Sequence, residues 1–211
     1  MRIALFAVAA LVGLSVTVTL SRAAAPAFSG TIEPVHWADL RHSYRAGCPV
    51  GPSELRTVSV SHWGFDGKPH VGRIVVAKRV APSVVSVFRT LWQAKFPIRR
   101  LQPVSAFRGS DDASMAADNT SAFNCRFVGG TSRWSMHAYG EAVDVNPVEN
   151  PYVGCGRTRD ARRSRFMDRS RLRRGMVTPA VVRAFRSVGW GWGGDWSGQT
   201  QDYMHFSTTG H

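Results

Sequence analysis

The chain has 211 residues, which is enough for one well-packed domain. Its 27 lysines and arginines outnumber the 14 aspartates and glutamates, so the formal net charge is +13 and anionic partners are favoured over cationic ones. The three cysteines include no C-x-x-C pair, which argues against a structural zinc knuckle.

The first 27 residues have the order of a secretory signal peptide. Arg2 precedes an apolar run over residues 3–20, and small residues follow up to Ala27. We predict cleavage after Ala27 or Ala25. The alternative is an uncleaved N-terminal anchor, because the apolar run is nearly long enough to span a bilayer. In both cases residues 28–211 are predicted to form a single domain with a loop-rich N-terminal extension, secreted or tethered outside the membrane.

This location changes how the charge is interpreted. Without Arg2 and Arg22, 25 basic residues remain against 14 acidic ones, a net charge of +11. A secreted protein rarely meets nucleic acid, so we expect no nucleic-acid partner and favour anionic cell-wall polymers or anionic lipid headgroups. Nine arginines lie within residues 157–174 against only Asp160 and Asp168. A solvated charged loop and a binding patch for such polymers both fit this arginine cluster. The chain itself is expected to be a monomer.

Cys48, Cys125 and Cys155 would face an oxidising compartment. Three cysteines there imply one disulfide and one free thiol. The residues alone leave the pairing open.

The N-terminal half is predicted to contain two strands and a helix. Residues 28–57 are rich in loops and contain three prolines. Residues 58–61 and 72–76 have strand patterns, and Asp66-Gly67 between them is a turn signal. Pro82 then opens a helix with apolar residues on one face: Val84, Val87, Phe88, Leu91 and Trp92.

The C-terminal half combines short strands with long polar segments. Residues 101–107 and 142–145 are predicted strands, and residues 109–134 between them are predicted to form a long loop of the kind that is often functional. A second helix is predicted over residues 179–187 and a final strand over residues 203–208. This order of elements predicts an α+β domain with a small antiparallel sheet and flanking helices, rather than a doubly wound sheet.

Two segments about sixty residues apart carry side chains that suit a zinc ion. The first contains His137 and Asp144, and the second contains Asp202 and His205. In a strand that includes Asp144, side chains alternate between faces, and a buried carboxylate there needs a partner such as a metal. Gly140 permits the bend that would bring His137 to the same point. Two imidazoles, a carboxylate and a nearby base are the groups that a catalytic zinc site requires.

Asp202 is the candidate for that base. Strict alternation in the last strand would place it on the face opposite His205. It can therefore act beside His205 only if it lies just before the strand, in a loop or at a bulge, and nothing in residues 197–201 prevents this.

The pattern of these residues resembles the zinc peptidases of the VanY/D-alanyl-D-alanine carboxypeptidase superfamily, which includes L-alanyl-D-glutamate endopeptidases. Three motifs carry the resemblance: Ser-x-His-x-x-Gly-x-Ala-x-Asp at residues 135–144, Trp-Gly-Gly-Asp-Trp at residues 192–196 and Asp-x-x-His-Phe at residues 202–206. Roughly residues 40–208 resemble an extended, actinobacterial-type branch of this superfamily.

The resemblance implies a Hedgehog/DD-peptidase-like fold, a Zn²⁺ cofactor and peptidoglycan stem peptides as substrates. His137, Asp144 and His205 are the implied zinc ligands, and Asp202 is the implied general base. The resemblance also implies a disulfide between Cys48 and Cys125, because both lie in family-like segments, with Cys155 left free.

An arginine before the first histidine is implied as well, to hold the scissile carbonyl or its oxyanion. Arg126 and Arg108 are the two candidates, and Arg126 is preferred because it lies within a family-like segment. Tyr203, Trp192 and Trp196 are candidates for the cleft walls, with a place in the core as their alternative.

The bond that is cut stays open between a D-Ala-D-Ala carboxypeptidase and an L-Ala-D-Glu endopeptidase. The motif Asp202-Tyr203-Met204-His205 differs from the Glu-Pro-Trp-His of many carboxypeptidases and favours the endopeptidase type slightly. The alternative function is a non-catalytic, zinc-containing cell-wall-binding module. The presence of Asp202, the implied general base, argues against this alternative. A role that rests on charge alone, in binding DNA or as an antimicrobial, would instead predict salt-dependent nucleic-acid binding that chelators leave unchanged.

Overall fold

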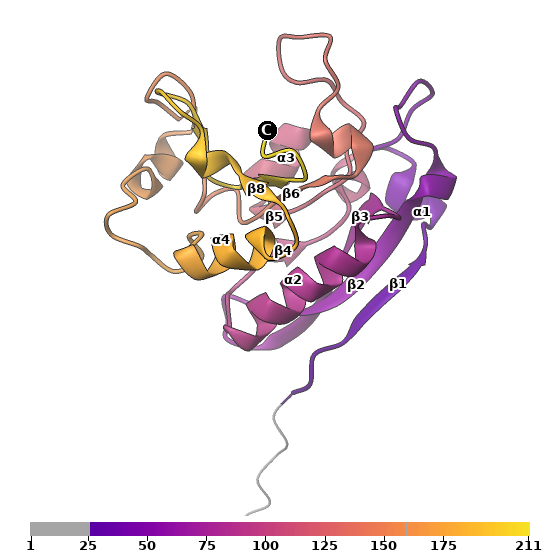
Figure 1. Cartoon of the computed structure of the whole chain (residues 1–211), viewed down its shortest axis with the longest axis horizontal. Helices are drawn as coiled ribbons and strands as arrows, with labels where there is room; N and C mark the ends of the chain where they lie inside the picture. Colours follow the sequence, from indigo (N-terminus) through magenta and orange to yellow (C-terminus); the bar gives the residue numbers. More distant parts are fainter. Residues whose placement is uncertain (1–25, 159) are drawn as a thin grey trace, which may run out of the picture.

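The computed structural model describes residues 26–158 and 160–211 (Figure 1). The predicted signal peptide or anchor lies outside this part of the chain, apart from its last two residues. Within the described residues, the helices are all too short or too polar to cross a membrane.

The first layer is an antiparallel sheet with the order β1-β2-β3. Strand β2 (Leu55–Trp63) and strand β3 (Pro69–Ala77) form a long hairpin, and β1 (Gly30–Pro34) pairs with the outer edge of β2. Both strands of the hairpin were predicted, and both are longer than their alternating segments. The predicted turn is confirmed at Gly67, whose φ of +74° is readily available only to glycine.

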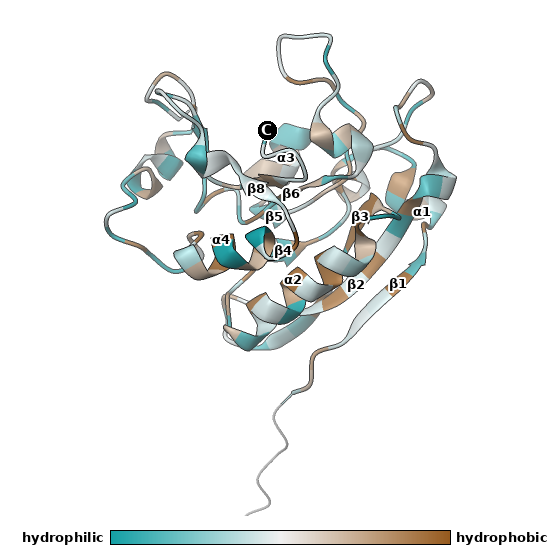
Figure 2. Cartoon of the chain, viewed as in Figure 1, coloured by the Kyte–Doolittle hydropathy of each residue, from teal (hydrophilic) through white to brown (hydrophobic). Residues whose placement is uncertain are grey.

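Helices α2 (Ala81–Gln93) and α4 (Pro179–Arg186) pack together beside this sheet (Figure 1). Both begin at a proline in the first turn, as their sequences predict, and the hydroxyl of Thr178 caps α4 by accepting a hydrogen bond from the Val181 N–H. The predicted apolar face of α2 is fully buried. Figure 2 shows hydrophobic residues along α2 and β2 and hydrophilic ones over much of the surrounding loops.

A second antiparallel sheet has the order β6-β10-β8. Its strands are β6 (Ala142–Asp144), β10 (His205–Ser207) and β8 (Gly191–Trp192). Val143 and Phe206 from this sheet join α2, α4 and the hairpin in one hydrophobic core. The prediction of an α+β chain with small antiparallel sheets is therefore confirmed. This packing fixes the second sheet, which carries Asp144 and His205, against the largest apolar cluster of the described residues.

Short elements complete the fold. Strands β4 (Arg100–Leu101) and β5 (Asn119–Thr120) pair in parallel, and β7 (Tyr152–Val153) pairs antiparallel with β9 (Gln201–Asp202). The remaining helices are single turns or short segments: α1 (Trp37–Leu40), α3 (Asp111–Ala116) and the 3₁₀ helices η1 (Pro52–Glu54), η2 (Val104–Phe107), η3 (Met136–Tyr139), η4 (Ala161–Phe166) and η5 (Gly193–Asp195).

Three predicted elements were wrong in part. The strand predicted over residues 101–107 ends after Leu101, because Pro103 donates no ladder hydrogen bond and the chain turns into η2. The predicted loop over residues 109–134 contains α3, which the Ser110 side chain caps. The final strand covers only Phe206 and its two neighbours, because residues 203–204 form a turn between β9 and β10.

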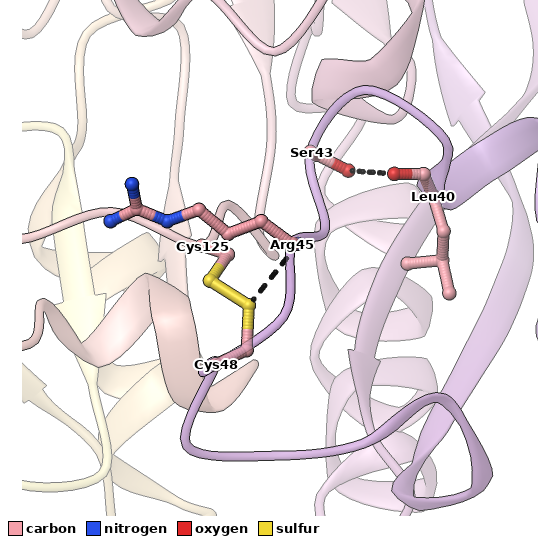
Figure 3. Close-up of a disulfide and its surroundings, with 5 residues drawn as sticks. All are labelled: Leu40, Ser43, Arg45, Cys48 and Cys125. Atoms are coloured by element: carbon pink, nitrogen blue, oxygen red, sulfur yellow. Dashed lines mark hydrogen bonds between the residues drawn. A yellow bond between two sulfur atoms is a disulfide. The ribbon is translucent and has the colours of Figure 1, made fainter.

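The disulfide joins Cys48 to Cys125, as the resemblance implied, and Cys155 is free and exposed (Figure 3). It connects two segments that are 77 residues apart in the chain. Beside it, the Arg45 N–H points at the Cys48 sulfur and the Ser43 hydroxyl donates to the Leu40 carbonyl. The bridge ties the N-terminal extension to the segment that continues into Arg126.

The arginines of residues 157–174 do not form one uniform surface. Arg169 is half-buried and donates to the carbonyl oxygens of Glu149 and Val177, at 3.3 and 2.8 Å, while its guanidinium covers the Tyr203 ring. Burial lowers the pKa of Arg169 to about 10. Arg163 is also buried, whereas most of the other arginines that the structure describes in this cluster are exposed. Part of the cluster therefore has a structural role.

Glu149 lies in a buried charged group with Asp118 and Arg99. Arg99 Nε is 2.8 Å from Asp118 Oδ2, and Arg99 Nη2 is 3.5 Å from Glu149 Oε1. Burial raises the pKa of Glu149 to about 8, and the neighbouring carboxyl of Asp118 adds to this shift.

We expect this group to make the protein less stable in mild alkali. In the unfolded chain the glutamate has a pKa of 4.5, so the folded protein holds the extra proton between the two values. The stabilisation is complete below the lower value and is lost as the pH rises through about 8. Glu149→Gln, which stays neutral, should remove this part of the pH dependence. The measurement is the change in urea midpoint between about pH 6 and about pH 9. An equal change in the wild-type protein and in Glu149→Gln would contradict the role given to Glu149.

Candidate active site

His137 is positioned by a short 3₁₀ helix and by a neighbouring backbone. It lies in η3, where the Ser135 hydroxyl accepts a hydrogen bond from the His137 N–H at 3.3 Å. Its ring Nδ1 is 2.6 Å from the carbonyl oxygen of Ala122. That carbonyl accepts a hydrogen bond from the protonated Nδ1, which leaves Nε2 with its lone pair for another partner.

Gly140 makes the bend that the sequence predicted after His137. It ends η3 with a φ of +69°, and its carbonyl accepts a hydrogen bond from the Ala77 N–H at 2.8 Å. A Cβ at this position would lie 2.6 Å from the Ala77 nitrogen. The bend therefore needs glycine both for its backbone conformation and for the close approach to β3.

Gly140→Ala should lower the free energy of unfolding by about 2–5 kcal/mol, because left-handed strain and a backbone clash act together. Gly67→Ala is the matched control, since Gly67 has a similar φ of +74° and open space around a Cβ. It should cost only about 1 kcal/mol. Equal destabilisation in chemical denaturation would show that the approach to Ala77 is unimportant.

Asp144 and His205 face each other across the second sheet. The register of β6 and β10 pairs them directly, and His205 Nδ1 is 3.1 Å from Asp144 Oδ1. His137 Nε2 is 3.2 Å from Asp144 Oδ2 and 3.3 Å from His205 Nδ1. One ligand atom from each of the three buried side chains lies within 4.8 Å of the other two. The residues that the sequence predicted as ligands are thus brought together at one point.

The electrostatics of this group are those of a site that binds a cation. Burial opposes the charge on Asp144, but the two imidazoles beside it hold the pKa of this carboxyl far below its usual range. Burial likewise lowers the pKa of His137, yet the charge and hydrogen bond of Asp144 outweigh it and the pKa is raised overall. The carboxylate therefore remains ionised in the interior, which suits the binding of a cation.

Asp202 lies before the last strand, as the alternation argument required, but in a short strand of its own. It belongs to β9 and pairs with Tyr152 of β7. Gly193 packs against it so closely that a Cβ there would lie 2.5 Å from the Asp202 carbonyl oxygen. Burial, and next the charge of Asp144, raise the pKa of Asp202 to about 7. Its buried Oδ1 has no hydrogen-bond partner among the residues described.

The structure separates the two arginine candidates. Arg126 lines the same cavities as Asp202 and Asp144, and its Nη2 is 3.0 Å from Asp111 Oδ2. Its Nε is buried and lacks a partner in the described part of the chain. Arg108 is exposed at the end of η2, and it lines none of the cavities described below.

Two adjoining cavities form a cleft over the three candidate ligands. One, of about 490 Å³, contains His137, His205 and Trp196, and the other, of about 540 Å³, contains Phe127 and Arg163. Five residues line both: Arg126, Val128, Asp144, Tyr152 and Asp202. The candidate base and arginine thus lie where the two arms of the cleft meet.

Several cleft residues were not predicted, and of the three aromatic candidates for its walls only one lines it. Trp196 lines the cleft, whereas Trp192 packs on Phe206 in the core and Tyr203 packs on Trp192. Trp134 and Tyr152 also line it, and neither is in a motif with a recognisable spacing. The contact between Ala122 and His137 uses a backbone carbonyl, which no side-chain pattern can indicate.

The donor set fits a zinc ion. Two imidazole nitrogens and one carboxylate are the ligand types of catalytic zinc sites, which keep a further position open for water or substrate. Side-chain atoms that are buried without a partner are rare in proteins, and three of those among the described residues lie here: Asp202 Oδ1, Arg126 Nε and His205 Nε2. The arrangement resembles the class of metal-dependent hydrolytic sites.

Comparison with known families agrees with this class. Residues 129–208, which include the motifs of all three candidate ligands and of Asp202, match a family model described as D-alanyl-D-alanine carboxypeptidase. This match confirms the resemblance of the motif-bearing segment to D-alanyl-D-alanine carboxypeptidase-type peptidases. Searches of curated proteins and of solved structures gave no significant match. Arg126 lies outside the matched residues.

Proposed function

We propose that this protein is a zinc peptidase that hydrolyses a peptide bond in the stem peptide of peptidoglycan. The observation that carries the proposal is the buried His137–Asp144–His205 donor set with Asp202 beside it in a cleft. The family match supports the same activity. The fold that we propose for it is Hedgehog/DD-peptidase-like, in the extended, actinobacterial-type branch.

His137 Nε2, Asp144 and His205 Nδ1 would hold the ion. A zinc ion at this site would supply Lewis-acid activation of water and of the scissile carbonyl. The Ala122 carbonyl fixes the tautomer and orientation of His137, and the pairing of β6 with β10 fixes Asp144 against His205.

Asp202 is proposed as the general base. Its carboxylate accepts the proton of the attacking water and returns it to the leaving amine. A carboxyl that burial has moved toward neutral pH performs both transfers better than an ordinary aspartate, and the charge of a bound cation would lower its pKa again. Arg126 is proposed to donate hydrogen bonds to the developing oxyanion, for which its unpartnered Nε is available.

We propose an internal bond of the stem, of the L-Ala-D-Glu type, as the bond that is cut. The cleft extends to both sides of the donor set, toward Trp196 in one arm and toward Phe127 in the other. A substrate that continues past the scissile bond in both directions fits such a cleft. A carboxypeptidase needs only one long arm and a cationic group for the terminal carboxylate.

The test is to incubate the purified protein with defined muropeptides, with and without a chelator, and to identify the products by mass spectrometry. Release between L-Ala and the next residue is the expected product, and it should disappear with the chelator. Loss of one terminal D-Ala would support the assignment as a peptidase but show that it is a carboxypeptidase rather than an endopeptidase. No product from the zinc-loaded protein would favour the alternative, a non-catalytic wall-binding module.

We place the protein outside the cytoplasmic membrane, associated with the cell wall as a monomer, either secreted or tethered by its N-terminal segment. A peptidase of the cell wall acts on that side, and the family match supports this location. The exposed arginines of residues 157–174 are proposed to contact anionic wall polymers rather than nucleic acid. Binding of the protein to isolated wall polymers in rising salt would test this contact.

A further inference from the structure

A third cavity, of about 560 Å³, lies between α1, β3, β4 and η2. No described residue lines both this cavity and the catalytic cleft. Four arginines line it: Arg41, Arg73, Arg99 and Arg100. Against them, Asp39 is the single carboxylate among the described residues that form its wall. The cavity is thus a second, separate site with an excess of positive charge.

Two of these arginines are held in place from behind by buried carboxylates. Arg73 Nη2 is 3.2 Å from Asp39 Oδ1, and Arg99 Nε is 2.8 Å from the carboxylate of Asp118. Both carboxylates are buried, while the arginine side chains remain 53% and 45% exposed. A guanidinium fixed at one edge keeps its other N–H groups for a ligand and loses little entropy on binding it.

The other two arginines have free donors. Arg100 Nε donates to the Ala117 carbonyl at 3.1 Å, which orients the side chain and leaves its terminal amines available. Arg41 is exposed and makes no ion pair with any residue that the structure describes. Together the four guanidinium groups offer several forked donors to one space, which is the geometry that suits phosphate oxygens.

His62 supplies an independent sign of a ligand. It lines the same cavity and is only 6% exposed, yet its Nδ1 has no hydrogen-bond partner in the described part of the chain. His70 stacks on it at 5.7 Å and is itself held by Asp66 at 3.0 Å. A buried polar atom without a partner is rare in proteins and therefore calls for an explanation.

We propose that this cavity binds the phosphate groups of an anionic polyol-phosphate polymer, and so holds the peptidase to the wall at a site apart from its cleft. Apart from the two histidines, no aromatic side chain lines the cavity within the described residues, so it lacks the stacking surfaces on which proteins hold single-stranded nucleic acid. The wall location rests on the proposed function, but the binding does not.

The experiment compares three probes by fluorescence anisotropy at fixed salt: a labelled poly(glycerol phosphate) oligomer, single-stranded DNA of equal charge, and inorganic phosphate as a competitor. The test variant is Arg41→Gln/Arg100→Gln. Arg89→Gln/Arg183→Gln is the matched control, because it removes the same charge from exposed positions outside this cavity and outside residues 157–174. Thermal midpoints of all proteins confirm that they are folded.

The proposal expects the test variant to bind the oligomer at least about tenfold more weakly and the control to change by less than about threefold, since charged hydrogen bonds rather than net charge hold the ligand. Both variants should hydrolyse a small soluble stem peptide at the wild-type rate. Equal losses in the two variants, no binding by the wild-type protein, or tighter binding of DNA than of the oligomer would overturn it. None of these outcomes bears on hydrolysis at the cleft, so the two proposals fail separately.

Discussion

Asp202→Asn should reduce kcat for stem-peptide hydrolysis by about 10²–10⁴-fold, the usual contribution of a general acid–base group. The asparagine keeps the shape of the side chain and its place in β9 but cannot accept the proton of the attacking water. The folded state should not suffer. In the wild-type protein a buried carboxyl oxygen lies there without a partner, close to the charge of Asp144. Steady-state kinetics on a defined stem peptide measures the loss.

The control for this substitution is Asp195→Asn. Asp195 lies in the nearby Trp-Gly-Gly-Asp-Trp motif at residues 192–196, but it is exposed and paired with Arg186 at 2.6 Å. It should leave kcat within about twofold of the wild-type value, because an exposed ion pair contributes little. Zinc content measured on both variants must equal that of the wild-type protein. An Asp202→Asn variant that binds zinc and turns over normally would remove Asp202 from the proposed role.

Asp144→Asn is the second substitution with a large expected effect, and it acts on metal binding. Asp144 contributes the only negative charge among the three candidate ligands and touches both imidazoles, at 3.2 and 3.1 Å. An amide oxygen is a weaker ligand for zinc than a carboxylate, and it leaves two imidazoles without a countercharge for the cation. We expect the variant to lose zinc on dialysis and to show no detectable hydrolysis.

Stability supplies a readout for this variant that does not depend on activity. A ligand that binds only the folded state at 100 times its Kd stabilises it by about 2.7 kcal/mol. The wild-type protein and Asp202→Asn should both show such a zinc-dependent rise in denaturation midpoint, and Asp144→Asn should show almost none. A normal rise in Asp144→Asn would mean that zinc binds elsewhere.

Local patterns predicted the elements that bury one periodic face. The apolar positions of α2, from Val84 to Trp92, follow the helical repeat closely enough to place the helix to within a residue of its start. The β2–β3 hairpin was also found, because Asp66-Gly67 is a strong turn signal between two alternating segments. Such elements are specified by neighbours in the sequence, so the sequence alone is sufficient.

Elements held by distant contacts were missed or misjudged. Residues 30–34 become a strand only because the edge of β2 is available to pair with them. Residues 104–107 have the composition of a strand, but Pro103 and the packing of η2 against α1 determine a 3₁₀ helix. The loop-rich description of residues 28–57 was therefore only partly right.

The candidate ligands and Asp202 could be proposed from the sequence because their chemistry is unusual at that spacing. Alternation then required Asp202 to precede the strand of His205. The residues that surround the candidate ligands and Asp202 could not be predicted. The Ala122 carbonyl reaches the His137 ring, and Tyr152 and Trp134 reach the cleft, through the packing of segments that no local pattern connects. Arg126 could be chosen over Arg108 only weakly from the sequence, and its position beside Asp202 now supports that choice.

A zinc titration of the chelator-treated protein, with bound zinc and stem-peptide hydrolysis followed together, tests the proposed zinc-dependent hydrolysis. We expect no hydrolysis without zinc and a rate that rises in proportion to bound zinc. The rate should saturate when the single His137–Asp144–His205 site is filled. Hydrolysis that persists after complete removal of the metal, or a fully loaded protein that cleaves no stem peptide, would contradict it.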